Sequence, residues 1–496
     1  MPSDTIDVPA GPSLAGRLAA AIALTIGFYA LALALAGALI AAGVLPWVFE
    51  GRNNLWLTIA GPFFGISILV AIFPRRIRFV APGLRLTAED QPRLHQLITD
   101  EAVRADEPVP AEIYLTFEPN ASVMEPKRGR RVLVVGIGLL RILTERELRG
   151  VLAHEFGHYR GGDLKAGPWI YRTRTAIGRT IDNLSEHEVA DESWSQRAIR
   201  KPFLWYGNAF LRITAAISRR EEFAADACAV QSVGRAAHVS ALQRLHAFGP
   251  GFDFYWQHEV VPVLQSGRRP SVSDGFRRFV EHEDVTKSAD AHLEEIREKA
   301  SDAYDSHPSL AERIAAVQGQ PDGVADNTPC AIGLLRDADA AERELLAYVI
   351  GDELREFEPV DWDAVGNEVY GRRAEALTEA YPQILDGVSL GTLPDAVAAI
   401  PATARKLDAD ESDDPNGLVA HVLGDGALLA LRSAGWTLTA EPAEPIGARR
   451  GDAVLAPHSV VDQLRTGELD AETWRERAQS LGVSDLELAR AAAPAA

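Results

Sequence analysis

A long uncharged segment near the start of the chain limits the folds that this sequence can adopt. Across Leu18–Phe49 the sequence contains no Asp, Glu, Lys or Arg, and alanine, leucine, isoleucine and valine dominate it. A helix that crosses a bilayer needs roughly 20 apolar residues, so this run is long enough. A second uncharged run, Leu55–Pro74, is just long enough, although Gly61-Pro62 should kink it. We therefore predict a transmembrane helical hairpin in residues 14–75.

Two other structures contain apolar runs, and both fit this sequence less well. The first is a pair of buried core helices in a soluble domain, which seldom has uncharged segments of this length. The second is a signal peptide, whose apolar core has roughly 7–15 residues and whose leader is basic. Here the leader carries Asp4 and Asp7 with a single Arg17.

Arginines after the second run set the predicted orientation. Arg75, Arg76, Arg78 and Arg85 follow it directly, whereas the connector between the two runs has only Arg52. Positive charges stay on the cytoplasmic side of a membrane. We therefore expect a multi-pass protein of the cell membrane (plasma or inner membrane), in contact with the lipid bilayer, with both termini and the remaining chain in the cytoplasm.

Net charge and cysteine content argue against two further classes of protein. The 496-residue chain has 50 Lys and Arg against 70 Asp and Glu, which gives a formal net charge of −20. No nucleic-acid partner is expected, because such binding needs a basic surface that displaces counterions. Two cysteines, Cys228 and Cys330, cannot staple a chain of this length, so a secreted disulfide scaffold is excluded and a reducing compartment is favoured.

Composition and chain-breaking residues divide the sequence into four parts. Residues 1–13 are polar and contain prolines, so we expect a flexible tail before the hairpin. A breaker cluster at Gln318–Gly323 predicts domains at 76–320 and 321–496. Between Asp352 and Asp395 the last region carries 11 acidic and three basic residues, which fits a solvated helical face better than an acidic docking surface. Its role is not indicated.

The domain at 76–320 mixes segments of helical and strand periodicity. Residues 112–117 alternate as a half-buried strand does, residues 131–135 have the composition of a neighbouring strand, and the polar residues 118–129 fit a connecting loop. The predicted fold class is α+β. It combines the membrane hairpin, a mainly helical domain with a small β-sheet, and a separate acidic C-terminal region that is α/β or helical.

The segment Thr144–His158 carries the clearest chemical signal. Its first residue and Glu147 have the spacing of a capping box, so a helix is predicted to begin here, and Gly161-Gly162 should end it. His154 and His158 are four residues apart and share one face of that helix, with Cβ atoms roughly 5–6 Å from each other. Two imidazoles at this separation can occupy adjacent corners of a zinc tetrahedron.

Glu155 follows the first histidine and would lie beside such a metal rather than on it. There it can take a proton from a zinc-bound water as a general base. The alternative is two surface histidines next to a glutamate, a pattern that long chains contain by chance. The apolar neighbours Leu152, Ala153 and Phe156 make the helix largely buried around the motif, which argues against this alternative.

A third ligand is available further along the chain. A catalytic zinc needs three protein ligands and one open position. Glu222 and Asp226 are four residues apart on a second predicted helix and face one way. Glu222 can complete a site of two histidines and one glutamate, while Asp226 can accept the spare N–H of a ligand histidine and fix its tautomer. Taken alone, Glu222 and Asp226 fit an ordinary charged helix face. Taken together with the His-Glu-x-x-His motif, they favour a site for one Zn²⁺ per chain.

Three short motifs follow one another across residues 80–320. They are His-Glu-x-x-His with an Asp five residues later, Ser-Arg-x-x-Glu-x-x-x-Asp, and His-Pro with an Arg six residues after the His, formed here by His154, Glu155, His158, Asp163, Ser218, Arg219, Glu222, Asp226, His307, Pro308 and Arg313. In content and order they resemble the HtpX-like membrane zinc metalloproteases, gluzincins that also include the CaaX prenyl endopeptidases. The resemblance extends to an N-terminal membrane anchor but not to the acidic C-terminal region.

The resemblance implies a zincin-like fold and a role for each matched residue. Zinc would be held by His154, His158 and Glu222, and Glu155 would activate the water. Asp226 and Asp163 would support the ligands from behind. His307 or Arg313 would donate to the oxyanion that forms when water adds to a peptide carbonyl, a role that stabilises the transition state by several kcal/mol. The alternative for His307-Pro308 and Arg313 is the start and surface of an ordinary helix.

Two departures from the family pattern bear on the substrate. Some members have further membrane spans between the two ligand helices, but 167–181 and 201–217 carry arginines and are too polar to span. We interpret both segments as amphipathic helices that lie on the bilayer or cover the cleft. An intramembrane chamber for prenylated peptides would need more spans, so the substrate class stays open. Asn120-Ala121 partly matches an edge to which the family adds extended substrates as a strand.

The sequence therefore favours a membrane-anchored zinc endopeptidase, which hydrolyses peptide bonds of membrane or membrane-proximal, including misfolded, proteins through a zinc-activated water. The first alternative is a membrane-tethered binding or scaffold protein with a structural or vestigial zinc site. It is disfavoured because a structural site needs a fourth protein ligand and no base, yet Glu155 is present. A zinc enzyme that acts on a non-peptide bond is a further alternative. No oligomeric state is indicated.

Overall fold

The chain is mainly helical with three small sheets, as a computed structural model describes it. The described residues are 14–50, 55–72, 79–127, 129–160, 194–299, 301–302, 305, 307–407 and 414–488. Within them, one four-stranded, one two-stranded and one three-stranded sheet are present. The predicted mainly helical domain with a small sheet is confirmed at this level.

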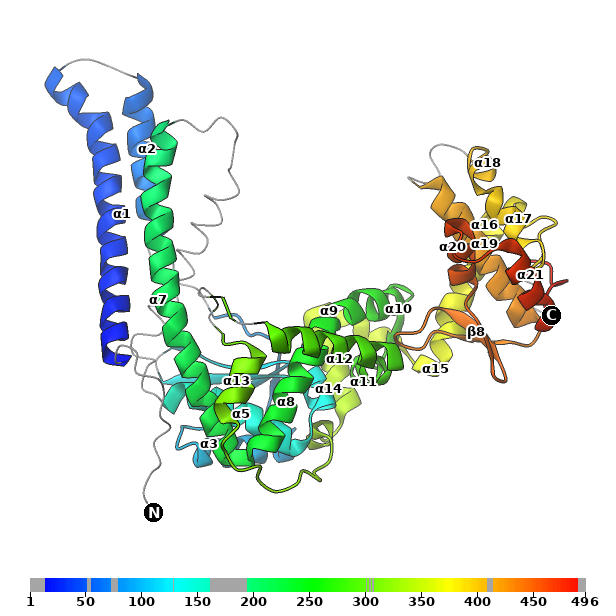
Figure 1. Ribbon diagram of the computed structural model, residues 1–496, viewed down its shortest axis with the longest axis horizontal. Coiled ribbons are helices and arrows are strands. Elements are labelled where there is room, and N and C mark those ends of the chain that lie inside the picture. The colour runs from blue at the N-terminus through cyan, green and yellow to red at the C-terminus, as the bar shows by residue number, and fades with distance from the viewer. Residues whose placement is uncertain are drawn as a thin grey trace.

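Two apolar helices open the structure and project away from the sheets and the C-terminal lobe (Figure 1). They are α1 (Leu14–Glu50) and α2 (Leu55–Ile72). The helices approach closely because α2 has glycines on the facing side. A Cβ at Gly61 would lie 2.5 Å from the carbonyl oxygen of Leu39, and one at Gly65 would lie 2.7 Å from that of Ala36. Small residues four apart permit such contacts between apolar helices.

Within the described part of the chain, one helix is long and apolar enough to cross a membrane. It is the segment Ile22–Pro46 of α1, 25 residues in length. Large apolar side chains of both helices are exposed, as a lipid-facing surface would require: Ile26, Leu33, Val44, Leu45, Val48, Ile59, Phe63 and Ile66. The first predicted span thus corresponds to an apolar N-terminal helix; the hairpin as two spans stays a prediction.

A single 40-residue helix, α7 (Trp194–Val233), links these helices to the rest of the chain (Figure 1). At 1.5 Å per residue it is about 60 Å long. Phe210 of α7 packs against Phe28 of α1, and the hydroxyl of Tyr206 donates to the carbonyl of Leu24. Residues 201–217 are therefore the middle of a long helix beside α1, whereas the segment 167–181 lies outside the described residues.

The four-stranded sheet has the order β1-β2-β4-β3. Its strands are β1 (Leu84–Leu86), β2 (Glu112–Thr116), β3 (Ala121–Lys127) and β4 (Arg130–Gly136). The two predicted strands pair in parallel as β2 and β4, which confirms them as neighbours. The predicted loop is wrong in part, because it contains β3, an edge strand antiparallel to β4. An edge strand pairs on one side only and so tolerates the polar side chains that suggested a loop.

The first hydrophobic core lies between this sheet and a set of helices that pack around it. These helices are α3 (Pro92–Arg104), α4 (Ile137–Ile142), α5 (Glu145–Arg160), α8 (Arg235–Phe248), α9 (Phe252–Tyr255), α10 (Val261–Gln265), α11 (Val272–Glu281), α12 (Glu283–Glu298) and α14 (Ala338–Val349). The short helix α13 (Leu310–Val317) packs against α7, α8 and α12. The predicted capping box begins α5: the N–H of Thr144 donates to the Glu147 carboxylate over 2.9 Å, and the N–H of Glu147 to the Thr144 hydroxyl over 3.1 Å. Leu148, Leu152 and Phe156 bury one side of α5 in the core.

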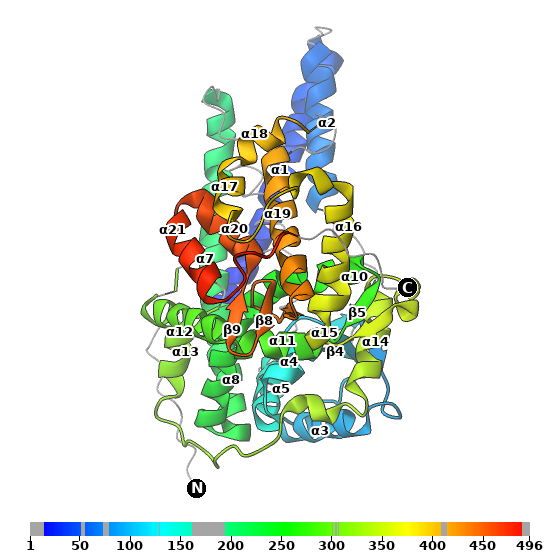
Figure 2. The same cartoon turned by 90° about the vertical axis from the view of Figure 1, so that its right-hand side faces the viewer.

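A second hydrophobic core, from Ala374 to Leu488, forms a lobe of its own (Figures 1 and 2). Its elements are α16 (Arg372–Ala380), α17 (Leu393–Ala398), α18 (Ile400–Ala404), α19 (Pro415–Ser433), β7 (Thr437–Thr439), β8 (Gly447–Arg450), β9 (Ala453–Leu455), α20 (Pro457–Thr466) and α21 (Ala471–Ser480). The chain between the lobes contains β6 (Glu358–Val360), which pairs with β5 (Arg268–Pro270), and α15 (Trp362–Val365). Side chains from Ala331 to Val369 still belong to the first core.

Candidate metal centre

The crossing of α5 and α7 brings the two predicted ligand motifs together. At the crossing, a Cβ on Gly157 would lie 2.9 Å from the Cα of Ala225 and 3.1 Å from the Cβ of Cys228. The absence of a side chain at Gly157, which lies between the two histidines of α5 in sequence, therefore allows the helices to approach closely at the candidate site. Cys228 is half-buried at this crossing and unpaired with any other cysteine.

The three predicted ligands converge on one point. The Nε2 atoms of His154 and His158 are 3.2 Å apart, and Glu222 places its carboxylate oxygens 3.5 Å and 3.8 Å from them. Zinc bonds of about 2.1 Å in a tetrahedron separate neighbouring ligand atoms by about 3.4 Å. Two imidazoles and a carboxylate at this spacing therefore fit zinc. Among the described residues, these three form a group of His, Cys, Asp or Glu side chains whose ligand atoms all lie within 4.8 Å of one another.

Asp226 anchors the ligands from behind. Its fully buried carboxylate accepts from Nδ1 of His154 over 3.0 Å and from Nε2 of His238 over 3.1 Å. Arg313 donates to the same carboxylate through Nε over 2.9 Å and through Nη2 over 2.5 Å. The bond to Nδ1 leaves Nε2 of His154 free to face a metal, which is the arrangement that the sequence motif predicts for Asp226. His238, on α8, was missed, because a lone histidine twelve residues after Asp226 matches no ligand spacing.

Arg313 and His307 occupy different positions around the site. The Arg313 side chain is 10% exposed, and its Nη1 lies 3.7 Å from the Glu222 carboxylate, so its charge is directed at the two acidic residues. His307 is 72% exposed at the cleft, with Nδ1 2.9 Å from Glu222. Arg219, another motif residue, donates to the backbone carbonyls of Asp302 and Asp305 and so ties α7 to the loop that carries His307. Asp163 lies outside the described residues.

Glu155 lies beside the ligands in the same cleft, where the sequence places a general base. Burial raises the pKa of the Glu155 carboxyl, and the neighbouring His154 together with the backbone N–H of Val123 opposes that rise. The Val123 contact joins α5 to the edge strand β3. Glu155, the three candidate ligands and the edge of strand β3 thus share one cleft.

The charges of the ligands depend on one another. Burial alone would lower the pKa of His154, but hydrogen bonds to Asp226 and Glu222 outweigh burial and raise the pKa to about 9. Burial and the charge on His154 lower the pKa of His158 to about 4. Burial disfavours the ionised forms of Glu222 and Asp226, yet their histidine and arginine partners hold both pKa values far below the usual range. With this raised pKa, His154 carries a proton, and thus a positive charge, at the position where a dication would bind. Metal binding would release that proton from His154.

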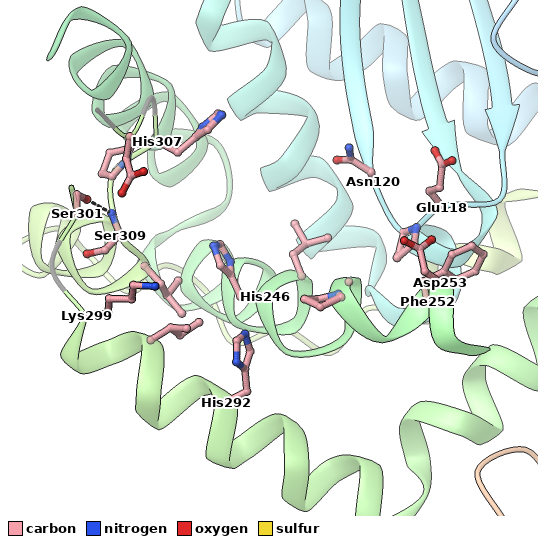
Figure 3. Close-up of a pocket in the computed structure, with 18 residues that line it drawn as sticks. Glu118, Asn120, His246, Phe252, Asp253, His292, Lys299, Ser301, His307 and Ser309 are labelled. Carbon is pink, nitrogen blue, oxygen red and sulfur yellow. Dashed lines mark hydrogen bonds between the residues drawn. The ribbon is translucent and has the colours of Figure 1, made fainter. Parts of the chain in front are cut away.

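The cleft around the ligands has a volume of about 350 Å³. The residues Asn120, Ala121 and Ser122 at the edge strand form one wall, and Ala241, Leu242 and Leu245 of α8 form another. A larger cleft of about 710 Å³ adjoins it and shares Asn120, Leu245, His246 and His307 with it. Figure 3 shows this second cleft, with His246, His292 and Lys299 toward one end and Glu118 and Asp253 toward the other.

A His-Glu-x-x-His helix crossed by a second helix with a glutamate ligand defines the zinc metallopeptidases of the gluzincin class. Residues 88–320 match the model of peptidase family M48. The resemblance to HtpX-like zinc metalloproteases is thereby confirmed. The chain carries the His-Glu-x-x-His helix and the His-His-Glu group that this family of enzymes uses.

Curated relatives of this region are distant in sequence. A protease HtpX homolog of Tropheryma whipplei (strain TW08/27) is 27% identical over 213 residues, which cover 38% of this chain and 72% of the relative. A protease HtpX homolog of Burkholderia mallei (strain SAVP1) is 30% identical over 183 residues, or 35% of this chain and 63% of the relative. The crystal structure of S. mikatae Ste24p matches at 18% identity with a TM-score of 0.28, covering 60% of this chain and 66% of that chain.

Proposed function

We propose that this chain is a membrane-anchored zinc endopeptidase that hydrolyses peptide bonds of membrane or membrane-proximal proteins, including misfolded ones. The observation that carries the proposal is the convergence of His154, His158 and Glu222 in one cleft with Glu155 beside them. The match of residues 88–320 to the model of a metallopeptidase family supports it.

We assign different steps of peptide hydrolysis to different residues of the cleft. Zinc bound by the three ligands would polarise the scissile carbonyl and lower the pKa of a bound water towards neutrality. Glu155 takes the proton of that water and passes it to the leaving amine. Its buried position supports this role, because burial raises the pKa of a carboxyl towards the value that a general base needs.

His307 and Arg313 have different proposed roles. His307 is exposed on the cleft wall, so its imidazole can turn to donate to the oxyanion. Arg313 is engaged with Asp226 and Glu222, so we propose that it acts mainly by holding these carboxylates and, through them, the orientation of His154. Arg313 is then a positioning residue. The family pattern allows either residue to donate to the oxyanion, and we assign that role mainly to His307.

The substrate is proposed to bind as an extended strand along β3. This strand lies at the edge of its sheet, and its residues 121–122 line the metal cleft. The N–H of Val123 points out of the sheet to Glu155, so this edge faces the reacting groups. A peptide added here gains main-chain hydrogen bonds without a sequence requirement, which suits exposed segments of unfolded proteins. The adjoining larger cleft would receive the next residues of the peptide.

The membrane part of the proposal rests on the apolar helices. The exposed apolar side chains of α1 and α2 support a hairpin with both helices in the bilayer. The arginines after α2 support a cytoplasmic catalytic domain. The scaffold alternative needs a fourth protein ligand, and the group of potential ligands in the described chain has three members.

The deciding experiment compares wild type with Glu155→Gln in detergent. We expect one zinc in the M48 site of both proteins and cleavage of an unfolded protein by the wild type alone. Glu476→Gln, an exposed change on α21 in the second lobe, is the matched control and should keep full activity. Cleavage by Glu155→Gln at the wild-type rate would refute the mechanism, and loss of zinc from wild type under metal-replete conditions would refute the ligand assignment.

A further inference from the structure

A second cluster of histidine and aspartate side chains lies in the C-terminal lobe, outside the M48 region. Helices α19 and α20 pack side by side there (Figure 2). Each carries a histidine followed four residues later by an aspartate: His421 and Asp425 on α19, and His458 and Asp462 on α20. Residues four apart share one helix face. The two pairs can therefore meet between the helices.

Two of these side chains are in contact, and a third lies beside them. Nε2 of His458 is 3.0 Å from the Asp425 carboxylate, and the imidazole rings of His421 and His458 have centroids 5.1 Å apart. The ring of His458 lies directly against Gly424, where a Cβ would be 2.4 Å from its Cδ2. A glycine at this position of α19 is therefore required for His458 to reach Asp425.

The His458 ring lacks the hydrogen bonds that a buried imidazole normally makes. Both of its ring nitrogens are buried and form no hydrogen bond with any residue that the structure describes, although Nε2 is close to Asp425. Buried polar atoms in folded proteins nearly always have a partner, and an ion or a water is the usual explanation for one that does not. Nε2 of His458 and the carboxylate oxygen of Asp425 are 3.0 Å apart without a hydrogen bond. This is close to the separation of neighbouring ligand atoms around a small cation.

We propose that His421, Asp425 and His458 bind one divalent transition-metal ion of the zinc class. Two imidazoles and a carboxylate are donors that such ions prefer, and the carboxylate is already buried, with 8% of its side chain exposed. His421 is the exposed member, and binding draws its imidazole towards the other two.

Such an ion would fasten α19 to α20 within the second core. Both helices contribute to that core, through Val422 and Leu423 on α19 and Val460 and Val461 on α20. Binding to the folded lobe alone would stabilise it against unfolding. The competing explanation is a plain ion pair between His458 and Asp425, which predicts neither metal content nor a metal-dependent melting temperature.

The test counts zinc in the full-length protein, purified in detergent without a histidine tag, stripped with chelator and dialysed against Zn²⁺. We expect two zinc ions in wild type, one in His421→Ala/His458→Ala and one in His154→Ala/His158→Ala. His258→Ala, a change at an exposed histidine elsewhere, should keep two. Co²⁺ in the His154→Ala/His158→Ala protein should give the visible absorption of a nitrogen- and oxygen-ligated ion.

Two further measurements separate loss of the site from loss of folding. His421→Gln alters the exposed ligand alone and should weaken zinc binding in the second lobe at least about tenfold, while peptidase activity stays within about twofold of wild type. Equal zinc content in wild type and in His421→Ala/His458→Ala would overturn the proposal. A melting temperature of the second lobe that does not respond to Zn²⁺ would also overturn it. Loss of the M48 zinc alone would leave this proposal intact and refute the proposed function.

Discussion

Replacing Asp226 with Asn tests how the metal ligands are held. The Asp226 carboxylate accepts from His154, His238 and Arg313 in a fully buried position. Asn has one acceptor oxygen and adds a donor, so at least one of these N–H groups loses its partner. A change in the residue that orients a ligand histidine typically weakens metal binding 10- to 100-fold, which is about 1.4–2.7 kcal/mol.

The same substitution also leaves the Arg313 charge buried without its partner. Removing one member of a buried ion pair costs about 3–5 kcal/mol of unfolding free energy. Because the Asn oxygen can still accept one hydrogen bond, we expect a loss of about 3 kcal/mol. Zinc affinity is measured by competition with a chelator and stability by denaturant unfolding of the metal-free protein. Asp226→Asn/Arg313→Leu should recover part of the stability, because no unpaired charge remains, but not the zinc affinity. Wild-type zinc affinity and stability in Asp226→Asn would refute this account.

Three other predictions concern the same cleft. Chelation should abolish proteolysis and added Zn²⁺ should restore it, and chelator-resistant cleavage would contradict a metal-dependent mechanism. His307→Ala should lower kcat about 100- to 1,000-fold with zinc content and melting temperature unchanged, because the side chain is exposed; an unchanged kcat would exclude it as the oxyanion donor. Gly157→Ala should cost about 1–3 kcal/mol and reduce zinc binding by separating α5 from α7, whereas Gly319→Ala, at a position with open space, should change neither.

The sequence predicts the group formed by His154, His158 and Glu222 because the signals for it are local. The capping box at Thr144 and the four-residue spacings on α5 and α7 depend on helix geometry alone, and both are found as expected. The strands β2 and β4 were predictable for a similar reason, since their apolar patterns are short and strong. Local signals thus identify what each element contains.

What the sequence does not reveal depends on contacts between distant segments. His238 reaches Asp226 only because α8 folds back on α7, and no spacing along the chain records this. The edge strand β3 was expected as a loop, because a strand paired on one side needs few apolar residues. The family pattern gives the oxyanion role to His307 or Arg313, but the neighbours of Arg313, which are Asp226 and Glu222, become apparent only when α13 is packed against α7.

The continuity of α7 has a mechanical consequence. Phe210, which packs on the apolar helix α1, and Glu222, which faces the metal site, lie on one unbroken helix and are about 18 Å apart along its axis. A rigid rod of that length that pivots by about 5° at Phe210 moves Glu222 by about 1.6 Å, while metal–ligand distances tolerate about 0.2 Å. A change in the tilt of α1 is therefore expected to move Glu222 relative to His154 and His158. In the proposed membrane-anchored enzyme, bilayer thickness, which influences helix tilt, would then change the distances between the metal ligands.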